Sequence, residues 1–217
     1  MTERELSTGF TFPTGLNEGY GLSAQTVQLA REKGYSLILT VDKRRGGASR
    51  AGLGETAGRE VIVTDHHVIQ QEPECLTLLH PSRMGRPWQY CCGAGVALQL
   101  SMAMTGPRKR PIMLAAIATI ADMMPLWEEN RILVRLGLKY LNERQFTAIE
   151  ALNEKKCELW TEKEVAYQIV PKLNAAGRLA ELCNINKHRA LSAAWKIRRR
   201  SNPQRRRSAR LIRSAAR

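Results

Sequence analysis

The residues best suited to chemistry follow an apolar run in the first third of the chain. Val61-Ile-Val-Thr is followed at once by Asp65, His66 and His67, so one carboxylate and two imidazoles stand together. Imidazole nitrogen and carboxylate oxygen together bind divalent ions such as manganese, iron or zinc. A polar turn after a strand is the alternative, and it would suffice for a lone Asp or His. Because two His are adjacent after an apolar strand, we favour a metal site.

Two further aspartates could contribute to the same site. Asp42 ends the apolar run that begins at Ser36, and Asp122 closes the apolar stretch that begins at Pro111. With Asp65 they are the only Asp of a chain that has 20 acidic residues, the rest being Glu. Surface Asp is common at turns and helix caps, so three Asp at the ends of apolar runs indicate placement for chemistry. A compositional bias toward Glu explains the count equally well.

A parallel sheet is the element that would bring these residues together. Residues 36–42 and 60–65 are nearly continuous apolar runs, as in strands covered on both faces, and residues 75–79 form a shorter third run. Strands of this kind, separated by connections, predict a parallel sheet with helical crossovers. Ligands bind at the carboxyl ends of strands in open α/β sheets. We therefore expect Asp42 and Asp65–His67 to lie side by side.

The remainder of the chain is predicted to be mostly helical. Apolar spacing predicts helices over residues 23–33, 93–104, 111–121, 130–141, 145–152 and 161–169. Pro111 would be the first residue of its helix, where proline is tolerated, and Thr161 with Glu164 fits a capping box. The predicted fold class is therefore α/β, a parallel sheet with helical crossovers followed by a mostly helical segment.

The net charge of +14 suggests a nucleic-acid partner, but the excess is confined to two segments. Residues 182–217 hold twelve Lys and Arg and no acid, and residues 43–59 hold five with Glu55 as the single acid. The rest of the chain is slightly acidic. We expect 182–217 to be disordered or a solvated basic helix, and a nucleic-acid-binding arm is the other interpretation.

Membrane and zinc-binding classes are disfavoured. The apolar stretches are too short to span a membrane, and the N-terminus lacks the apolar core of a signal peptide. The five Cys are odd in number and form no Cys-x-x-Cys pair, which argues against structural zinc. A reducing, cytoplasmic location is therefore expected.

Seven strings of residues, taken in order, carry a family resemblance. They are Asn17–Leu22, Leu37–Asp42, Val61–His67, Gly93–Ala97, Ala118–Leu126, Asn130–Leu133 and Pro171–Arg178. On these strings the chain resembles the RecJ family of single-strand-specific 5′-to-3′ DNA exonucleases, within the DHH phosphoesterase superfamily. The strings Ala121–Leu126 and Leu173–Arg178 together are typical of RecJ, which disfavours a DHH enzyme that acts on small phosphates.

The resemblance implies phosphodiester hydrolysis of single-stranded DNA in repair and recombination, with two divalent ions, Mn²⁺ or Mg²⁺, as cofactors. It assigns Asp42 to bridging the two ions, and His66 and Asp122 to binding them. His67 would contact the scissile phosphate, and Asp65 would orient the site. A single-strand-binding protein or a helicase is implied as a further partner.

The resemblance also implies a contact with the DNA backbone near the end of its last string. Arg178 and Asn174 match the segment that faces the DNA in the family, although a helix-end cation is an equally good interpretation of Arg178. Gly93 and Gly95 could let the backbone approach a phosphate at a helix start. Close helix packing explains this glycine pair as well.

The chain departs from the family pattern in three respects. No Asp-x-Asp pair precedes Asp42, and the Gly-Gly-rich motif of the family's second domain is absent. The sequence therefore resembles a truncated central fragment, for which we expect little or no nuclease activity. Third, segments 43–59 and 182–217 are Arg-rich where the family has amphipathic helices with acids. We hypothesise a frameshift in both, and the absence of a RecJ-like helix from the other reading frames would contradict it.

Three regions are expected along the chain. Residues 1–126 would form a partial DHH phosphoesterase domain without its first motif, residues 127–181 a helical connector, and residues 182–217 a basic tail. The alternative function is a non-catalytic nucleic-acid-binding fragment that uses this tail. It predicts salt-dependent DNA binding that disappears when residues 182–217 are deleted.

Overall fold

The computed structural model describes residues 9, 22–42, 60–69, 72–73, 75–154 and 156–178. The two basic segments, 43–59 and 182–217, lie outside these ranges, as does nearly all of the Asn17–Leu22 string. The frameshift hypothesis, the predictions for the tail and the three-region division therefore stay predictions.

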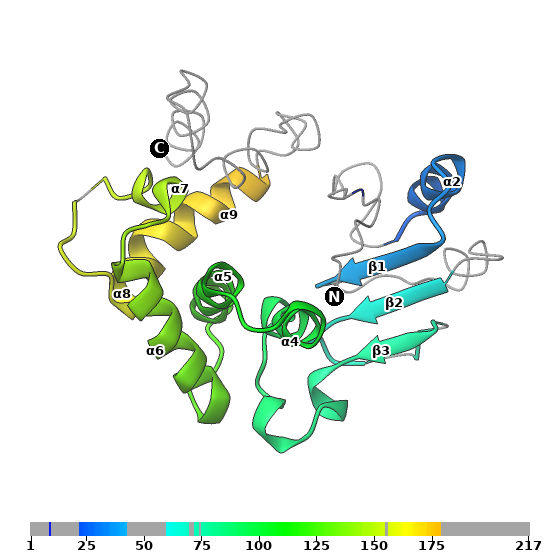
Figure 1. Ribbon diagram of the computed structural model, residues 1–217, viewed down its shortest axis with the longest axis horizontal. Helices are drawn as coiled ribbons and strands as arrows, with labels where there is room; N and C mark the ends of the chain where they lie inside the picture. The colour runs from blue at the N-terminus through cyan, green and yellow to red at the C-terminus, as the bar shows by residue number, and fades with distance from the viewer. Residues whose placement is uncertain are drawn as a thin grey trace.

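A three-stranded parallel sheet carries the residues singled out in the sequence (Figure 1). Its strands are β1 (Leu37–Val41), β2 (Glu60–Thr64) and β3 (Thr77–Leu79), with β2 in the centre. Val41 pairs with Thr64, and Thr64 pairs with Leu79, so the three strands end at the same level. The predicted parallel sheet is confirmed. The β2–β3 connection is an exception to the expected helical crossovers, because its described residues form no helix.

One face of the sheet packs against helix α2 (Ala24–Glu32); Ser23, predicted as its first residue, is its N-cap. Val27 of this helix forms a buried cluster with Val61 and Val63 of β2. The expectation that β1 is covered on both faces is wrong. Its other face, formed by Leu37, Leu39 and Val41, is 45–50% exposed, because β1 is an outer strand of the described sheet.

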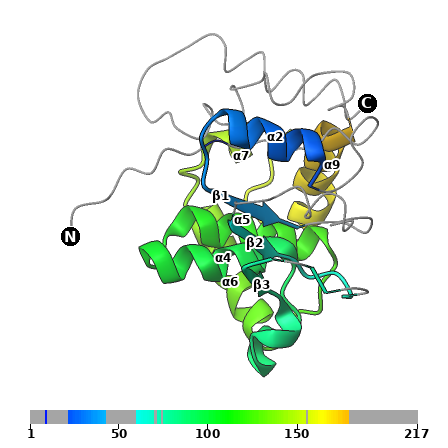
Figure 2. The same cartoon turned by 90° about the vertical axis from the view of Figure 1, so that its right-hand side faces the viewer.

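Three helices follow the sheet and lie side by side: α4 (Gly93–Thr105), α5 (Lys109–Ala121) and α6 (Glu128–Asn142). The strands in Figure 1 point toward α4, and the turned view in Figure 2 shows α2 apart from the α4–α6 group. Pro111 is the third residue of α5 rather than the first. The first turn of a helix has no intrahelical partner for its N–H groups, so proline is tolerated there as well.

The C-terminal helices are α7 (Thr147–Glu150), α8 (Glu162–Glu164) and α9 (Val170–Arg178), with a π-helical turn, η3 (Val165–Ile169), between the last two. Half of the predicted capping box is present: the Glu164 N–H donates to Thr161 Oγ1 at 3.3 Å, while Glu164 Oε2 accepts the Thr161 hydroxyl at 3.0 Å rather than the Thr161 backbone N–H. Pro171, which has no N–H to donate, lies just after the π turn. Among the described residues, no helix combines the length and apolarity needed to cross a membrane.

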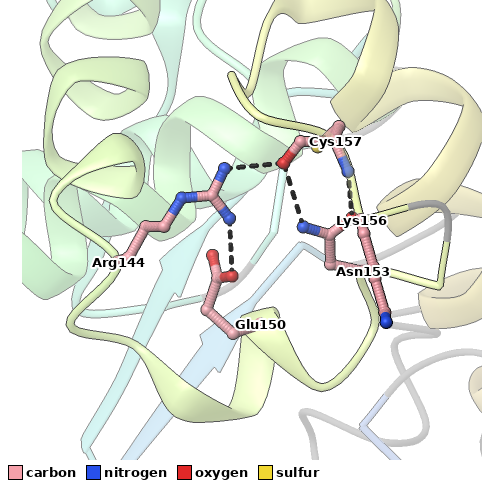
Figure 3. A pocket seen from close by; sticks show the side chains of 5 residues that line it. All are labelled: Arg144, Glu150, Asn153, Lys156 and Cys157. Carbon is pink, nitrogen blue, oxygen red and sulfur yellow. Dashed lines mark hydrogen bonds and ion pairs between the residues drawn. The ribbon is translucent and has the colours of Figure 1, made fainter.

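A shallow hollow of about 350 Å³ lies beside α7 (Figure 3). The side chains that line it stabilise the local structure rather than form a binding site. The Arg144 guanidinium donates to Glu150 Oε2 at 2.8 Å and to the Cys157 carbonyl at 2.7 Å. Asn153 Oδ1 accepts the Cys157 N–H at 2.9 Å. Most polar groups of the hollow therefore bind one another and tie the 153–158 loop to α7.

Helices α5 and α6 pack closely at Gly137 of α6, where a Cβ atom would collide with the Cβ of Ala116 on α5. We expect Gly137→Ala to lower the free energy of unfolding by about 1–2 kcal/mol. Overpacking costs about 1–3 kcal/mol, and the better helix propensity of Ala returns about 1 kcal/mol at most. Urea denaturation measures the change. Arg135→Ala, at an exposed position of α6, is the control, and a Gly137→Ala variant as stable as the wild type would contradict this packing.

Candidate metal centre

The two predicted strand-end motifs do lie side by side. The Asp42 N–H donates to the Thr64 carbonyl at 3.0 Å, and the Asp65 N–H donates to the Leu79 carbonyl at 3.1 Å. The hydrogen-bond ladder of the sheet therefore continues one residue beyond each strand. The backbone holds Asp42 next to the Asp65–His67 triplet before any side-chain contact is considered.

One donor atom each of Asp42, His66 and His67 lies within 4.8 Å of the others, and Asp122 approaches the same centre through His66 alone. His66 Nε2 lies 3.2 Å from Asp42 Oδ1 and 3.9 Å from Asp122 Oδ2. Two donor atoms that are each about 2.1 Å from one divalent ion, at angles between 90° and the tetrahedral value, are about 3.0–3.4 Å apart. The His66–Asp42 pair has this spacing, whereas the His66–Asp122 pair is wider and Asp122 lies outside the group of mutually close donor atoms. The donor set, one imidazole nitrogen and two carboxylates, suits Mn²⁺ or another divalent ion.

His67 is nearby, but its nearer nitrogen is already used. His67 Nδ1 is 3.9 Å from Asp42 Oδ1 and only 2.8 Å from Asp65 Oδ1. The same Asp65 oxygen accepts the backbone N–H of His66 at 2.7 Å and that of His67 at 3.3 Å. Since an ionised carboxylate only accepts hydrogen bonds, Nδ1 of His67 carries a proton. Asp65 thus fixes the ring of His67 and leaves Nε2 as its available nitrogen.

The carboxylates make the centre strongly attractive to a positive charge. The hydrogen bond to Asp42 and the negative charges of Asp42, Asp122 and Asp65 raise the pKa of His66 above its ordinary value, although partial burial acts in the opposite direction. The negative charges that favour a proton on His66 would also favour a divalent cation at this centre. The side chains of Asp42 and Asp122 are 49% and 40% exposed, so solvent ions have access to them.

Two residues at the centre have unusual backbone conformations. Asp42 and Met123, which directly follows Asp122, both have φ near +53°. For residues other than glycine this left-handed region is uncommon, although Asp tolerates it better than most. Such conformations cluster at functional sites, where the surrounding structure holds them. The chain therefore bends sharply at Asp42 and just after Asp122.

Gly93, the first residue of α4, leaves room for Asp42. A Cβ atom at position 93 would lie 2.6 Å from Oδ1 and 2.7 Å from both Cβ and Cγ of Asp42. A Cβ atom at Gly95 would instead meet Cys91 Cβ at 3.3 Å. Neither contact is the helix packing offered as one explanation: Gly95 lies against the cysteines just before α4, and Gly93 lets the candidate ligand Asp42 lie against the start of the helix. The approach of this backbone to a phosphate stays a prediction.

Sequence reasoning missed His80, which supports the triplet. His80 is 7% exposed, and its Nδ1 accepts the Ser82 backbone N–H at 3.2 Å. Nδ1 is therefore unprotonated, and Nε2–H donates to the His67 carbonyl at 2.8 Å. The only sequence signal was its place directly after a strand that neighbours the triplet strand.

Asn130 likewise supports the loop after Asp122 through hydrogen bonds to backbone carbonyls. It is 3% exposed, and its amide nitrogen donates to the carbonyls of Tyr90 at 2.7 Å and Pro125 at 2.9 Å. Asn130 thereby joins the start of α6 to the segments before α4 and after α5. It lies in one of the strings that carried the resemblance, but its type alone did not indicate this role.

Of the two residues predicted to face DNA, only Asn174 has a described side chain. Asn174 is exposed on α9, and among the described residues no hydrogen bond joins it to the candidate ligands. The backbone of Arg178 ends the same helix. Their assignment to DNA contact stays a prediction.

The described cysteines do not form a metal site. Cys91 and Cys92 are buried, and burial raises the pKa of Cys91 to about 11 and that of Cys92 above its ordinary value. Both thiols are protonated at neutral pH, whereas a metal ligand must be a thiolate. Cys92 Sγ instead accepts the Gly95 N–H at 3.3 Å, as an N-cap of α4.

In this chain, Asp42 follows one strand of a parallel sheet and Asp65–His67 follow the next. This arrangement is that of the DHH-type α/β phosphoesterase fold. The predicted fold class is confirmed in this respect. No family model matches the chain.

Within this class, comparison with known proteins finds that the chain is similar to RecJ. The chain is 36% identical over 179 residues to the single-stranded-DNA-specific exonuclease RecJ of Bacillus subtilis, covering 79% of this chain and 23% of that protein. The crystal structure of RecJ from Thermus thermophilus in complex with Mn²⁺ matches with a TM-score of 0.67 and 31% identity, over 89% of this chain and 29% of that one. The Mg²⁺ complex of RecJ from the same organism matches with a TM-score of 0.56 and 28% identity, with the same coverage.

The chain is a relative of RecJ, and the resemblance predicted from its motifs is confirmed. It spans 23–34% of the length of the curated relatives it matches. The relationship therefore concerns one segment of RecJ, the segment that carries the DHH triplet.

Proposed function

We propose that this chain provides the metal-binding segment of a RecJ-type exonuclease, which hydrolyses phosphodiester bonds of single-stranded DNA from the 5′ end. The observation that carries the proposal is the grouping of donor atoms of Asp42, His66 and His67 within 4.8 Å of one another, with Asp122 Oδ2 3.9 Å from His66 Nε2. The relationship to RecJ, whose solved structures contain Mn²⁺ or Mg²⁺, supports the same ions here.

In this proposal each residue has one part. His66 and Asp122 bind metal, and Asp42, whose carboxylate has two oxygens and is half exposed, bridges two ions. Paired divalent ions, when bound, polarise the phosphoryl group and stabilise charge on the attacking and leaving oxygens. The chain's own contribution is to place the phosphate against these side chains.

His67 is the residue proposed to touch that phosphate. Because Asp65 accepts the hydrogen bond from Nδ1–H, the ring is held in one orientation, and in the imidazolium form its Nε2–H would donate to a phosphate oxygen. An imidazole fixed in this way by a carboxylate contacts its target without first ordering a rotamer, which lowers the entropic cost of binding. Asp65 itself is a positioning residue in this scheme.

Titration with Mn²⁺, followed by the electron paramagnetic resonance signal of the free ion, tests the proposal. We expect the full chain to bind Mn²⁺ and His66→Ala to lose most of that affinity, since one of three ligands is removed. Arg135→Ala, at an exposed position of α6, is the comparison for a substitution away from the centre. A wild-type chain that leaves all Mn²⁺ free, or a His66→Ala variant that binds like the wild type, would refute the site.

Degradation of 5′-labelled single-stranded DNA against the matching duplex then tests the substrate. Only three ligand side chains lie on the described residues, so we expect slow or undetectable turnover, restricted to the single strand and dependent on Mn²⁺. Turnover that favours the duplex would contradict the proposed substrate class.

A further inference from the structure

An open groove of about 450 Å³ adjoins the candidate metal centre, and its lining points to a phosphate ligand. His66 forms part of its wall, and the remaining lining residues are His80, Pro81, Ser82, Gly85, Arg86 and Gln89. The volume falls within the range of about 300–1,000 Å³ that is usual for small-molecule sites. Because His66 is shared, a ligand held at the metal centre could extend into the groove.

The charge of the groove favours an anion. Its lining contains the cation Arg86 and no carboxylate. Arg83 and Arg86 lie on the same segment but differ in whether a carboxylate is near enough to pair with them. Arg83, in the short 3₁₀ helix η1 (Pro81–Arg83), forms an ion pair with Glu72. Arg86 begins the next one, η2 (Arg86–Trp88), where no carboxylate of the described residues lies within 4.0 Å of it.

The groove is built on the same framework as the metal centre. The buried His80 ring donates to the His67 carbonyl at 2.8 Å and accepts the Ser82 N–H at 3.2 Å. This imidazole therefore ties the segment that carries Arg86 to the triplet that carries His66 and His67. The groove wall is therefore joined to the residues of the metal centre by partly buried hydrogen bonds.

We propose that this groove binds the nucleotide next to the reacting phosphate, and that Arg86 binds the adjoining phosphate group. The inference rests on the proposed function, because the first phosphate is taken to occupy the metal centre. A guanidinium suits this part, since it stays charged at every relevant pH and offers several donors to phosphate oxygens. The contact is to the backbone, so it does not depend on the base.

Thymidine 3′,5′-bisphosphate is the probe, because it carries two phosphates on one nucleoside and no phosphodiester bond to hydrolyse. The experiment measures relaxation of its ³¹P nuclei by Mn²⁺ bound to the full chain. That signal reports only nucleotide next to the metal, so weak binding to the basic tail does not contribute. Thymidine 5′-monophosphate and 3′-monophosphate serve as single-phosphate references.

We expect the wild type to bind the bisphosphate about tenfold more tightly than either monophosphate, as one charge-assisted contact allows. Arg86→Gln should abolish this difference and leave Mn²⁺ affinity unchanged, whereas Arg83→Gln should keep it. Equal affinities in the wild type, or an advantage that survives in Arg86→Gln, overturn the groove assignment alone. Failure of the wild type to bind Mn²⁺ overturns the proposed function, and this inference with it.

Discussion

Asp42→Asn is expected to lower the affinity of the chain for Mn²⁺ by about 100-fold or more. Removing a hydrogen-bonding partner of a ligand typically lowers metal affinity by about 10- to 100-fold. Loss of the charge of the ligand itself should lower it by at least about 100-fold. Asn is the right replacement, because Asp42 has φ +53° and Asn adopts this conformation almost as readily. The variant therefore changes the charge without straining the turn after β1.

The measurement is a Mn²⁺ titration of wild type and variant at equal protein concentration, with urea denaturation to compare stability. Glu60→Gln is the matched control, since Glu60 is an exposed acid at the opposite end of β2. We expect the control to bind Mn²⁺ like the wild type. Equal losses in both variants would show that only the general negative charge matters, and Asp42 would then not be a ligand.

Gly93→Ala is expected to weaken Mn²⁺ binding by about 10- to 100-fold while the fold is retained. The added Cβ atom would lie 2.7 Å from the Cβ of Asp42. Rotation of the Asp42 side chain cannot relieve this contact, because a Cβ atom is fixed by its own backbone. Either the turn at residue 42 or the start of α4 must move, and the carboxylate moves away from His66.

Gly95→Ala, two residues further along the same helix, is the control that separates site geometry from local packing. Its Cβ atom would meet Cys91 Cβ at 3.3 Å, and none of its three nearest atoms belongs to a candidate ligand. We expect Gly95→Ala to cost stability in urea and to keep its Mn²⁺ affinity, the reverse of Gly93→Ala. A Gly93→Ala variant with wild-type affinity would show that the position of Asp42 does not depend on this glycine.

The largest parts of the fold could be predicted because their signals are local. The apolar runs before Asp42 and Asp65 specify strands, and successive strands with intervening connections specify a parallel sheet. In a parallel sheet the strand ends meet at one edge, so the nearness of Asp42 to His66 followed from topology alone. The capping residue Thr161 was equally readable, since it bonds an N–H three residues away.

Other features depended on which segments pack together. Whether both faces of β1 are covered is decided by its neighbours, and the same apolar run suits either outcome. His80 was passed over because a single His after a strand is compatible with many roles until its partner, the His67 carbonyl, is known. Asn130 likewise bonds Tyr90, 40 residues earlier in the chain.

The sequence by itself determined the elements and the chemistry available to this protein, because residue type and short-range spacing are encoded in consecutive residues. It specified an Asp-His-His triplet after a buried strand, two more aspartates and the relationship to RecJ. Only the tertiary structure decided that Asp122 approaches His66, that Gly93 makes room for Asp42 and that Arg86 adjoins the centre. These outcomes depend on helices and loops that are distant in the chain, where ångström-scale packing selects one arrangement among many.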